Sequence, residues 1–344
     1  HDLPVAFCDR SVEVWARARR SSLREESREK RGTRMYLLKR LIQPPRNDPG
    51  NGDSGAEEGS KDKPRMGFSI EQGRRPYQED TMSSTMSMPT AGGDAAFFGM
   101  FDGHGGVKAA AWAKDNLSKN VALALAKTTQ PETALVMAFK KTDAEFLAHA
   151  RRENLFDGCT ATSALLIGRE LYVANAGDSR TVICRGTRGT PLSDDHKPDK
   201  PSERRRIEHA GGTVTFFGCA RVNGVLATSR GFGDQELKQW VTAEPEVKKR
   251  ILDEGDEFLV LATDGLWDVL SNDDAARIIS GEKSVQGAAK KLTSEALRLG
   301  TMDNVSAIVL DLRALVAGMG KAEKKDSLRS PSLKSASFNG RFAQ

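Results

Sequence analysis

The chain has 344 residues, of which 38% are hydrophobic and 29% are charged, and its formal net charge is +5. This content of apolar residues suffices for one large domain or two small ones, and it excludes a disordered or fibrous protein. The positive charge lies at the ends: residues 1–46 carry 12 Lys and Arg against 6 Asp and Glu, residues 321–344 carry 6 against 2, and the middle has a net charge of −5. An acidic middle argues against a nucleic-acid-binding domain, so we expect no nucleic-acid partner.

The four cysteines have no spacing typical of a zinc site or a disulfide framework: they are Cys8, Cys159, Cys184 and Cys219. We therefore expect an intracellular protein, in the cytoplasm or nucleus. No apolar run approaches the ~20 residues needed to cross a bilayer, so we expect no membrane span. Because the chain begins with His1, organelle targeting stays open, although the Arg-rich residues 15–40 contain three glutamates that fit a transit peptide poorly.

Two segments lack the apolar residues that would order them by burial. Residues 43–65 are crowded with Pro, Gly, Asp and Ser and are predicted to form a linker, and the chain again loses apolar periodicity from about Met319 onward. We expect a basic arm and linker over residues 1–65, one folded domain over residues 66–315, and a basic disordered tail over residues 316–344.

The domain contains both short apolar runs and longer segments with helical spacing. The runs rich in Val, Ile and Phe predict strands at 97–101, 160–167, 170–175, 181–185, 258–263 and 305–311. Helical spacing predicts helices at 107–126, 131–152, 202–210, 272–280 and 284–299. Because helices and strands do not alternate regularly, the order favours an α+β fold over a doubly wound parallel sheet.

Acidic residues recur at the ends of these predicted strands. Asp102 and Asp264 follow strands, Asp178 lies in a turn between two strands, and Asp303 precedes a strand. Glu79 and Asp80 come just before the extended stretch TMSSTMSM. Acids that follow strands and acids that precede them meet at one rim only if the strands run antiparallel, so the chemistry favours antiparallel sheets.

Several carboxylates at one rim repel each other unless cations neutralise them. Hard oxygen donors without clustered Cys or His indicate Mg²⁺ or Mn²⁺. Two such ions about 3.5 to 4 Å apart can share a water and hold it as a hydroxide for in-line attack on phosphorus. Arg75 in GRRPYQED is suited to binding a phosphate by two hydrogen bonds, and His104 in FDGHGG is suited to protonating the leaving oxygen.

Each motif also has a purely structural interpretation. DGHGG and GDSR are both common turn sequences, and GDSR taken alone is better explained as a hairpin turn. Asp268 in TDGLWD fits a helix N-cap, and Trp267 fits a core position. His196 and His209 have no partner at ligand spacing, so we expect surface or satisfied helix residues.

Eight segments, in order, resemble the metal-dependent protein phosphatases of type 2C: RRPYQED, FDGHGG, GCTATSALL, ANAGDSR, DDHKPDKPSERRRIEHAGG, RVNGVLATSRGFGD, LATDGLWDVLSNDD and MDNVSAIVL. They span about residues 66–312, nearly the whole predicted domain. Within the family, the segments DDHKP and EHAGG look most like those of the short plant-type enzymes.

The resemblance implies a central sandwich of two antiparallel β-sheets flanked by helices, and a monomer that hydrolyses phosphoserine and phosphothreonine in proteins with a hydroxide bridging two Mg²⁺ or Mn²⁺ ions. It implies metal ligation by Asp102, by the carbonyl of Gly103, and by Glu79, Asp80, Asp264 and Asp303. Arg75 matches the phosphate-binding arginine and His104 the general acid. Asp178 and Asp268 match acids that some members use for a weaker third metal.

The chain departs from the family at Cys159, which replaces the usual serine, and we expect this thiol to pack as a small hydrophobe. The segment from Asp234 to Glu244 is short, which leaves substrate preference open. Two other functions remain as alternatives, a non-enzymatic sensor with this fold and a two-metal nuclease. A cysteine-dependent tyrosine phosphatase is excluded, because no cysteine is followed six positions later by arginine.

Overall fold

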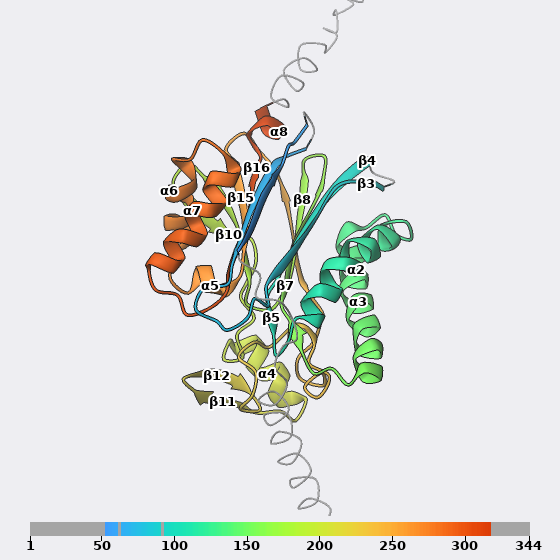
Figure 1. The fold of residues 1–344 in the computed structure, drawn as a ribbon. Helices are drawn as coiled ribbons and strands as arrows, with labels where there is room; N and C mark the ends of the chain where they lie inside the picture. Colours follow the sequence, from blue (N-terminus) through green and yellow to red (C-terminus); the bar gives the residue numbers. More distant parts are fainter. Residues whose placement is uncertain (1–51, 61–62, 91–92, 318–344) are drawn as a thin grey trace, which may run out of the picture.

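Two antiparallel sheets packed face to face form the centre of the molecule (Figure 1). The computed structural model describes residues 52–60, 63–90 and 93–317. The first sheet has six strands, which in order across the sheet are β1 (Asp53–Glu57), β2 (Arg65–Glu71), β16 (Val305–Asp311), β15 (Phe258–Ala262), β9 (Arg180–Arg185) and β10 (Arg188–Pro191). All of its neighbouring strands run antiparallel.

The second sheet has five strands, also antiparallel throughout. Their order is β14 (Glu246–Ile251), β8 (Glu170–Ala176), β7 (Ala161–Ile167), β4 (Gly93–Phe101) and β3 (Thr81–Thr90). A small sheet of β13 (Phe232–Gly233), β6 (Gly158–Cys159) and β5 (Gly103–His104) continues from one end of the sandwich.

Helices cover the outer face of each sheet (Figure 1). The five-stranded sheet is covered by α2 (Lys108–Leu125) and α3 (Pro131–Glu153). The six-stranded sheet is covered by α6 (Asn272–Ser280) and α7 (Val285–Arg298), which begin at the N-caps Ser271 and Ser284. These serines each accept a backbone hydrogen bond from the first turn, which satisfies an otherwise unpaired donor. The short helices α5 (Asp264–Trp267) and α8 (Arg313–Ala317) complete this side.

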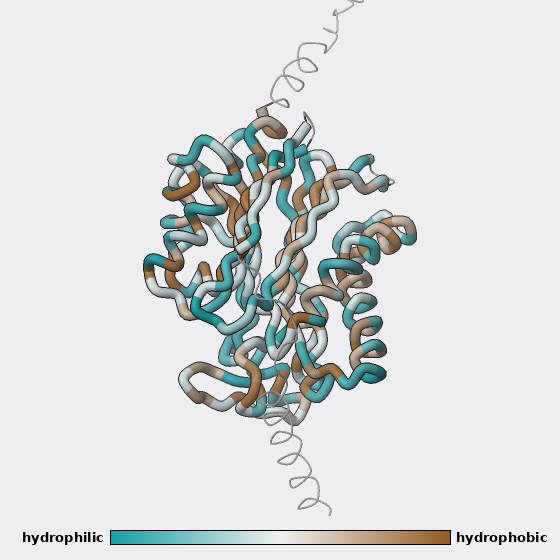
Figure 2. The backbone as a smooth tube through the Cα atoms, in the orientation of Figure 1, coloured by the Kyte–Doolittle hydropathy of each residue, from teal (hydrophilic) through white to brown (hydrophobic). Residues whose placement is uncertain are grey.

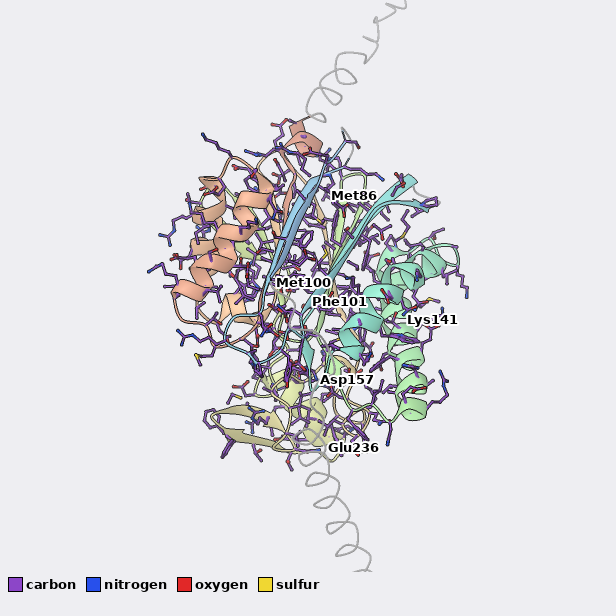
Figure 3. The ribbon with its side chains drawn as sticks, in the orientation of Figure 1. Met86, Met100, Phe101, Lys141, Asp157 and Glu236 are labelled. Carbon is purple, nitrogen blue, oxygen red and sulfur yellow. The ribbon has the colours of Figure 1, made fainter. Side chains whose placement is uncertain are left out.

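The central strands are buried on both faces. In β4, alternate side chains pack into two different apolar layers. Phe97 and Phe101 pack with α2 and α3, whereas Phe98 and Met100 pack against the other sheet. Figure 3 places Met100 between the two sheets, and Figure 2 shows hydrophobic residues along the central strands. Because successive side chains of a strand point to opposite faces, a strand with a layer on each side needs a continuous apolar run.

A smaller unit lies at the lower end of the sandwich in Figure 1. It contains α4 (Pro201–His209) and the hairpin of β11 (Val214–Phe217) and β12 (Cys219–Val222). Its own apolar cluster includes Ile207, Val222 and Val241. The hairpin tip exposes Phe216 and Phe217.

The expected α+β sandwich of two antiparallel sheets flanked by helices is confirmed. The predicted helices match within one or two residues. The first predicted strand, however, begins earlier, at Gly93, whereas the second matches β7 within one residue and is preceded by the short strand β6.

The prediction of a linker over residues 43–65 is wrong for its second half. Residues 53–57 form β1, which pairs with β2, and β2 itself begins at Arg65. Polar, glycine-rich residues form a strand there because an edge strand is held by backbone hydrogen bonds, which the apolar pattern does not reveal. Residues 43–51, most of the predicted arm and most of the predicted tail lie outside the described residues.

Candidate active site

The acids predicted to converge come from loops at one end of both sheets. In the five-stranded sheet, Thr81 pairs with Phe101, so Asp80 and Asp102 leave the sheet side by side. In the six-stranded sheet, Ala262 pairs with Ala307, which brings the start of α5 at Asp264 close to the residues before β16. Antiparallel pairing therefore gathers acids that follow strands with acids that precede them, as the sequence predicts.

Asp80 connects the two sheets directly. Its Oδ2 accepts hydrogen bonds from Thr263 Oγ1 at 3.0 Å and from Ser306 Oγ at 2.7 Å, and both donors belong to the six-stranded side. Burial, with repulsion from Asp303 and Glu79, raises the pKa of Asp80 to about 7 despite these hydrogen bonds. The carboxylate is thus held in place while its negative charge is poorly compensated.

Asp102 lies where β4 gives way to β5. Burial, followed by repulsion from four other aspartates, raises its pKa well above the ordinary value; the four are Asp80, Asp264, Asp303 and Asp178. Its neighbour Gly103 passes so close to Glu79 that a Cβ there would lie 2.4 Å from the Glu79 carbonyl oxygen. Only glycine permits this approach, which brings the Glu79 loop against β5.

Arg75 lies at the edge of the same group of acids. Its Nη2 donates to Asp303 Oδ2 at 2.6 Å, and the guanidinium is half-exposed. Glu79 Oε1 accepts a hydrogen bond from the backbone N–H of Gly106 at 2.6 Å. The arginine therefore has one side engaged with a carboxylate of the cluster and another side open to solvent.

Asp178, Asp264 and Asp268 form the other part of the cluster. Burial, then repulsion from Asp178, raises the pKa of Asp264 well above its ordinary value. The Nζ atom of Lys197 donates to Asp178 Oδ2 at 2.6 Å and lies 3.6 Å from Asp264 Oδ2. Burial alone would lower the pKa of Lys197, but Asp178 and Asp264 raise it above the ordinary range, so this lysine is a resident positive charge.

His104 lies in β5, two residues beyond Asp102, and its ring is paired with a carboxylate that the sequence analysis did not single out. Nε2 lies 3.0 Å from Oδ1 and 2.9 Å from Oδ2 of Asp234. Asp234 ends the motif RGFGD, which offered the only sequence signal. Thus all ten predicted site residues lie at this end of the sandwich, and Asp234 joins them.

Two further residues were missed. Asn304 accepts a hydrogen bond from the Glu79 backbone N–H through Oδ1 and donates through Nδ2 to the carbonyls of Gln72 and Tyr77. It thereby ties the loop that carries Arg75 and Glu79 to the start of β16. The second missed residue is Lys197. In the sequence, Asn304 is notable only for following Asp303, and Lys197 only for preceding Pro198.

Several structural interpretations are corrected. Asp178 does not lie in a hairpin turn, because β8 and β9 belong to different sheets and the turn crosses between them. Asp268 is the C-cap of α5, while the N-cap of α6 is Ser271. His196 is buried outside any helix, where Nδ1 accepts the Gly177 N–H.

Other expectations are confirmed. His209 is exposed in the last turn of α4, and Trp267 is buried and donates through Nε1 to the Ala262 carbonyl. Cys159 is fully buried in the apolar layer between the five-stranded sheet and its helices, and burial raises the pKa of its thiol.

The donor set of the cluster suits hard divalent cations. Its side chains offer carboxylate oxygens, and mutual repulsion shows that their charge is under-compensated. Within the described residues, no group of three or more His, Cys, Asp or Glu is already arranged to hold a metal ion. Protein donors occupy several of the oxygens instead, among them Thr263, Ser306, Arg75 and Lys197.

Comparisons with known proteins agree with this geometry. The profile of the family described as Protein phosphatase 2C matches residues 65–305, more than half of the chain. Over 270 residues the chain is 45% identical to "Probable protein phosphatase 2C 55" of Oryza sativa subsp. japonica, covering 78% of this chain and 70% of that relative. It is 43% identical over 244 residues to "Probable protein phosphatase 2C 59" of Arabidopsis thaliana, covering 71% of this chain and 78% of the relative.

The chain does not cover the same share of every relative. It is 44% identical to "Probable protein phosphatase 2C 52" of Oryza sativa subsp. japonica over 71% of its own length, and this match covers 50% of that relative. Among solved structures, a serine-threonine phosphatase 2C from Toxoplasma gondii superimposes with a TM-score of 0.69 at 24% identity, covering 77% of this chain and 99% of that one, which shows the shared fold. The chain therefore belongs to the protein phosphatase 2C family of metal-dependent serine/threonine phosphatases.

Proposed function

We propose that this chain hydrolyses phosphoserine and phosphothreonine in proteins by direct attack of water on phosphorus, with two Mg²⁺ or Mn²⁺ ions. One observation carries the proposal: loops from both sheets bring a cluster of repelling carboxylates together with an arginine and a histidine. Without cations, such a cluster would also repel a phosphate.

The residues proposed to hold the ions are the acids of the cluster and one backbone carbonyl: Glu79, Asp80, Asp102, Gly103, Asp264 and Asp303. Asp178 and Asp268 are proposed to hold a weaker third ion. Bound Mg²⁺ or Mn²⁺ supplies a water of lowered pKa and neutralises the charge of the phosphate. The hydroxyl groups of Thr263 and Ser306 keep Asp80 in one orientation.

Arg75 is proposed to bind the phosphate. Its guanidinium is half-exposed at the edge of the cluster and already binds a carboxylate, an anion with a similar arrangement of oxygens. A planar guanidinium can form two parallel hydrogen bonds to phosphate oxygens, which orients the ester for attack.

His104 is proposed to protonate the leaving serine or threonine oxygen. It lies two residues beyond Asp102, and its side chain is 17% exposed, so the ring is not closed off from solvent. An alkoxide is a poor leaving group, and a positioned acid removes its charge as the bond to phosphorus breaks.

We further propose that residues 66–315 act as a monomeric catalytic unit in a reducing, intracellular setting. The described cysteines Cys159, Cys184 and Cys219 are free thiols. Most exposed large apolar residues of the described part are scattered, apart from Phe216 and Phe217, which does not suggest an extensive dimer interface. No helix in the described ranges is long and apolar enough to cross a membrane.

The test is hydrolysis of a phosphothreonine peptide and of p-nitrophenyl phosphate with Mn²⁺, with and without a chelator. We expect metal-dependent activity on both, and Asp102→Asn is expected to lower kcat/KM at least about a hundredfold, because even the loss of an outer partner of a metal ligand costs about 10- to 100-fold. Asp94→Asn is the matched control, since Asp94 is an exposed acid on β4 that pairs with Lys63. Activity that survives chelation, or an unaffected Asp102→Asn variant, would contradict the proposal.

A further inference from the structure

The pairing of His104 with Asp234 is the most specific contact of the site. Both carboxylate oxygens of Asp234 lie within 3.0 Å of Nε2. The carboxylate is completely buried, whereas the imidazole is 17% exposed. A completely buried acid therefore holds the ring, while part of the ring itself remains exposed.

The small sheet β13-β6-β5 brings the two residues together. Gly158 in β6 pairs with His104 of β5 on one side and with Gly233 of β13 on the other, and Asp234 follows directly after Gly233. A Cβ at position 158 would lie 2.2 Å from Asp234 Oδ2 and 2.5 Å from His104 Nε2. The contact therefore requires glycine at this position.

The backbone of Asp234 is unusual as well. Its φ of +49° lies in the left-handed region, which few residues other than glycine adopt, although aspartate and asparagine do so more often than most, and its N–H donates to the Asp157 carbonyl at 3.2 Å. Backbone strain of this kind persists where the surrounding structure enforces it, and it is concentrated at functional sites.

Two other buried acids lie nearby but are engaged elsewhere. Asp143 Oδ1 accepts hydrogen bonds from the Gly233 N–H and from Lys238 Nζ. Asp157 Oδ2 accepts the N–H of Ala109 at the start of α2. Asp234 is thus the acid of this group that contacts the imidazole.

We propose that Asp234 is a positioning residue that accepts the Nε2–H of His104 and leaves Nδ1 as the atom that protonates the leaving oxygen. This inference rests on the proposed function. Within the described residues, both hydrogen bonds of the His104 ring use Nε2, and neither of them uses Nδ1. An acid that holds one ring nitrogen fixes the tautomer and orientation of the imidazole.

The proton transfer balances as follows. The Nδ1–H bond breaks and its proton joins the serine or threonine oxygen, which keeps the electron pair of its former bond to phosphorus. The water oxygen forms the new bond to phosphorus, and both of its protons stay with the product, which leaves as dihydrogen phosphate. His104 is left as a neutral imidazole with its remaining proton on Nε2, directed at Asp234.

The first test compares two substrates in a double-mutant cycle of Asp234→Asn and His104→Ala. Asp234→Asn is expected to lower kcat at least about tenfold on a phosphothreonine peptide and less than about threefold on p-nitrophenyl phosphate, whose leaving group scarcely needs a proton. On the peptide, the substitution should cost little more once His104 is already alanine. Asp143→Asn, a buried acid that does not contact the ring, should affect both substrates alike.

Equal losses on the two substrates, or full additivity with His104→Ala, would overturn the inference. If Asp234→Asn fails to fold, Gly158→Ala separates the same two groups and should give the same substrate dependence. A second measurement is independent of catalysis: long-range ¹H–¹⁵N NMR of the neutral ring should show the proton on Nε2 of His104. A proton on Nδ1 would overturn the inference, whereas an inactive wild type with the proton on Nε2 would contradict only the proposed function.

Discussion

Among single residues, Lys197 matters most for the charge of the cluster, because its ammonium neutralises part of the negative charge of Asp178 and Asp264. Its ammonium is 2.6 Å from Asp178 Oδ2 and 3.6 Å from Asp264 Oδ2, so it occupies an oxygen of Asp178 that the proposed third divalent ion would need. A flexible lysine side chain can leave, but its positive charge opposes a second cation at the same oxygens.

Lys197→Met is therefore expected to tighten the weakest Mn²⁺ binding step by about tenfold or more, a change of about 1.4 kcal/mol. Isothermal titration calorimetry without substrate measures both the number of ions and their affinities. Lys200→Met serves as the control, because Lys200 pairs with Asp194 at 3.0 Å outside the cluster. Unchanged Mn²⁺ isotherms for Lys197→Met would show that the lysine does not compete with the ion.

At the scale of elements, α4 is fastened to the strand segment that leads to Asp234 by one buried carboxylate. Glu203 accepts hydrogen bonds from Arg230 Nη2 at 2.6 Å, from Arg206 Nη2 at 2.9 Å and from Ser229 Oγ at 2.8 Å. Burial alone would raise its pKa, but the two arginines lower the pKa of Glu203 to about 2. The smaller unit is thereby coupled to the end of the sandwich that holds the acidic cluster.

Glu203→Gln is expected to lower the free energy of unfolding by about 3 kcal/mol at pH 7, because two partly buried arginines lose their buried counter-charge. A carboxylate with a depressed pKa stabilises the fold fully above its unfolded value of 4.5, and this stabilisation is lost as the pH falls toward about 2. The difference between wild type and variant should shrink across that window in denaturant titrations. Glu208→Gln, exposed on the same helix, should stay within about 0.5 kcal/mol at every pH.

At the scale of the whole molecule, the two sheets share one apolar layer along most of their length and meet in an acidic cluster at one end. Strong mutual repulsion between buried carboxylates destabilises the folded state, and cations that bind there relieve it. Stability and the proposed metal binding are therefore coupled through both sheets.

Saturating Mn²⁺ is expected to raise the Tm, since a ligand at 100 times its Kd stabilises a fold by about 2.7 kcal/mol, or roughly 5 to 10 °C for a domain of this size. Differential scanning calorimetry with Mn²⁺ and with a chelator measures the shift. Asp102→Asn should reduce the shift and Asp94→Asn should leave it intact. The same Tm with Mn²⁺ and with chelator would contradict metal binding by the folded chain.

The main helices, the central strands and the kind of chemistry could be predicted from the sequence alone. Apolar periodicity predicted the ends of α2, α3, α6 and α7 within one or two residues, because helical periodicity depends on residues only three or four positions apart. The acids at strand ends predicted antiparallel sheets and hard cations, because the type of donor is a local property.

Which side chains meet could not be predicted, because it depends on the three-dimensional packing. The partnership of Asp234 with His104 spans 130 positions and depends on two strand registers around Gly158. Lys197 reaches Asp178 because a turn crosses from one sheet to the other, and β1 forms because β2 offers it an edge. Such contacts follow from strand register and sheet packing, which depend on interactions between residues far apart in the chain. The residues that form these contacts therefore show no periodic pattern in the sequence.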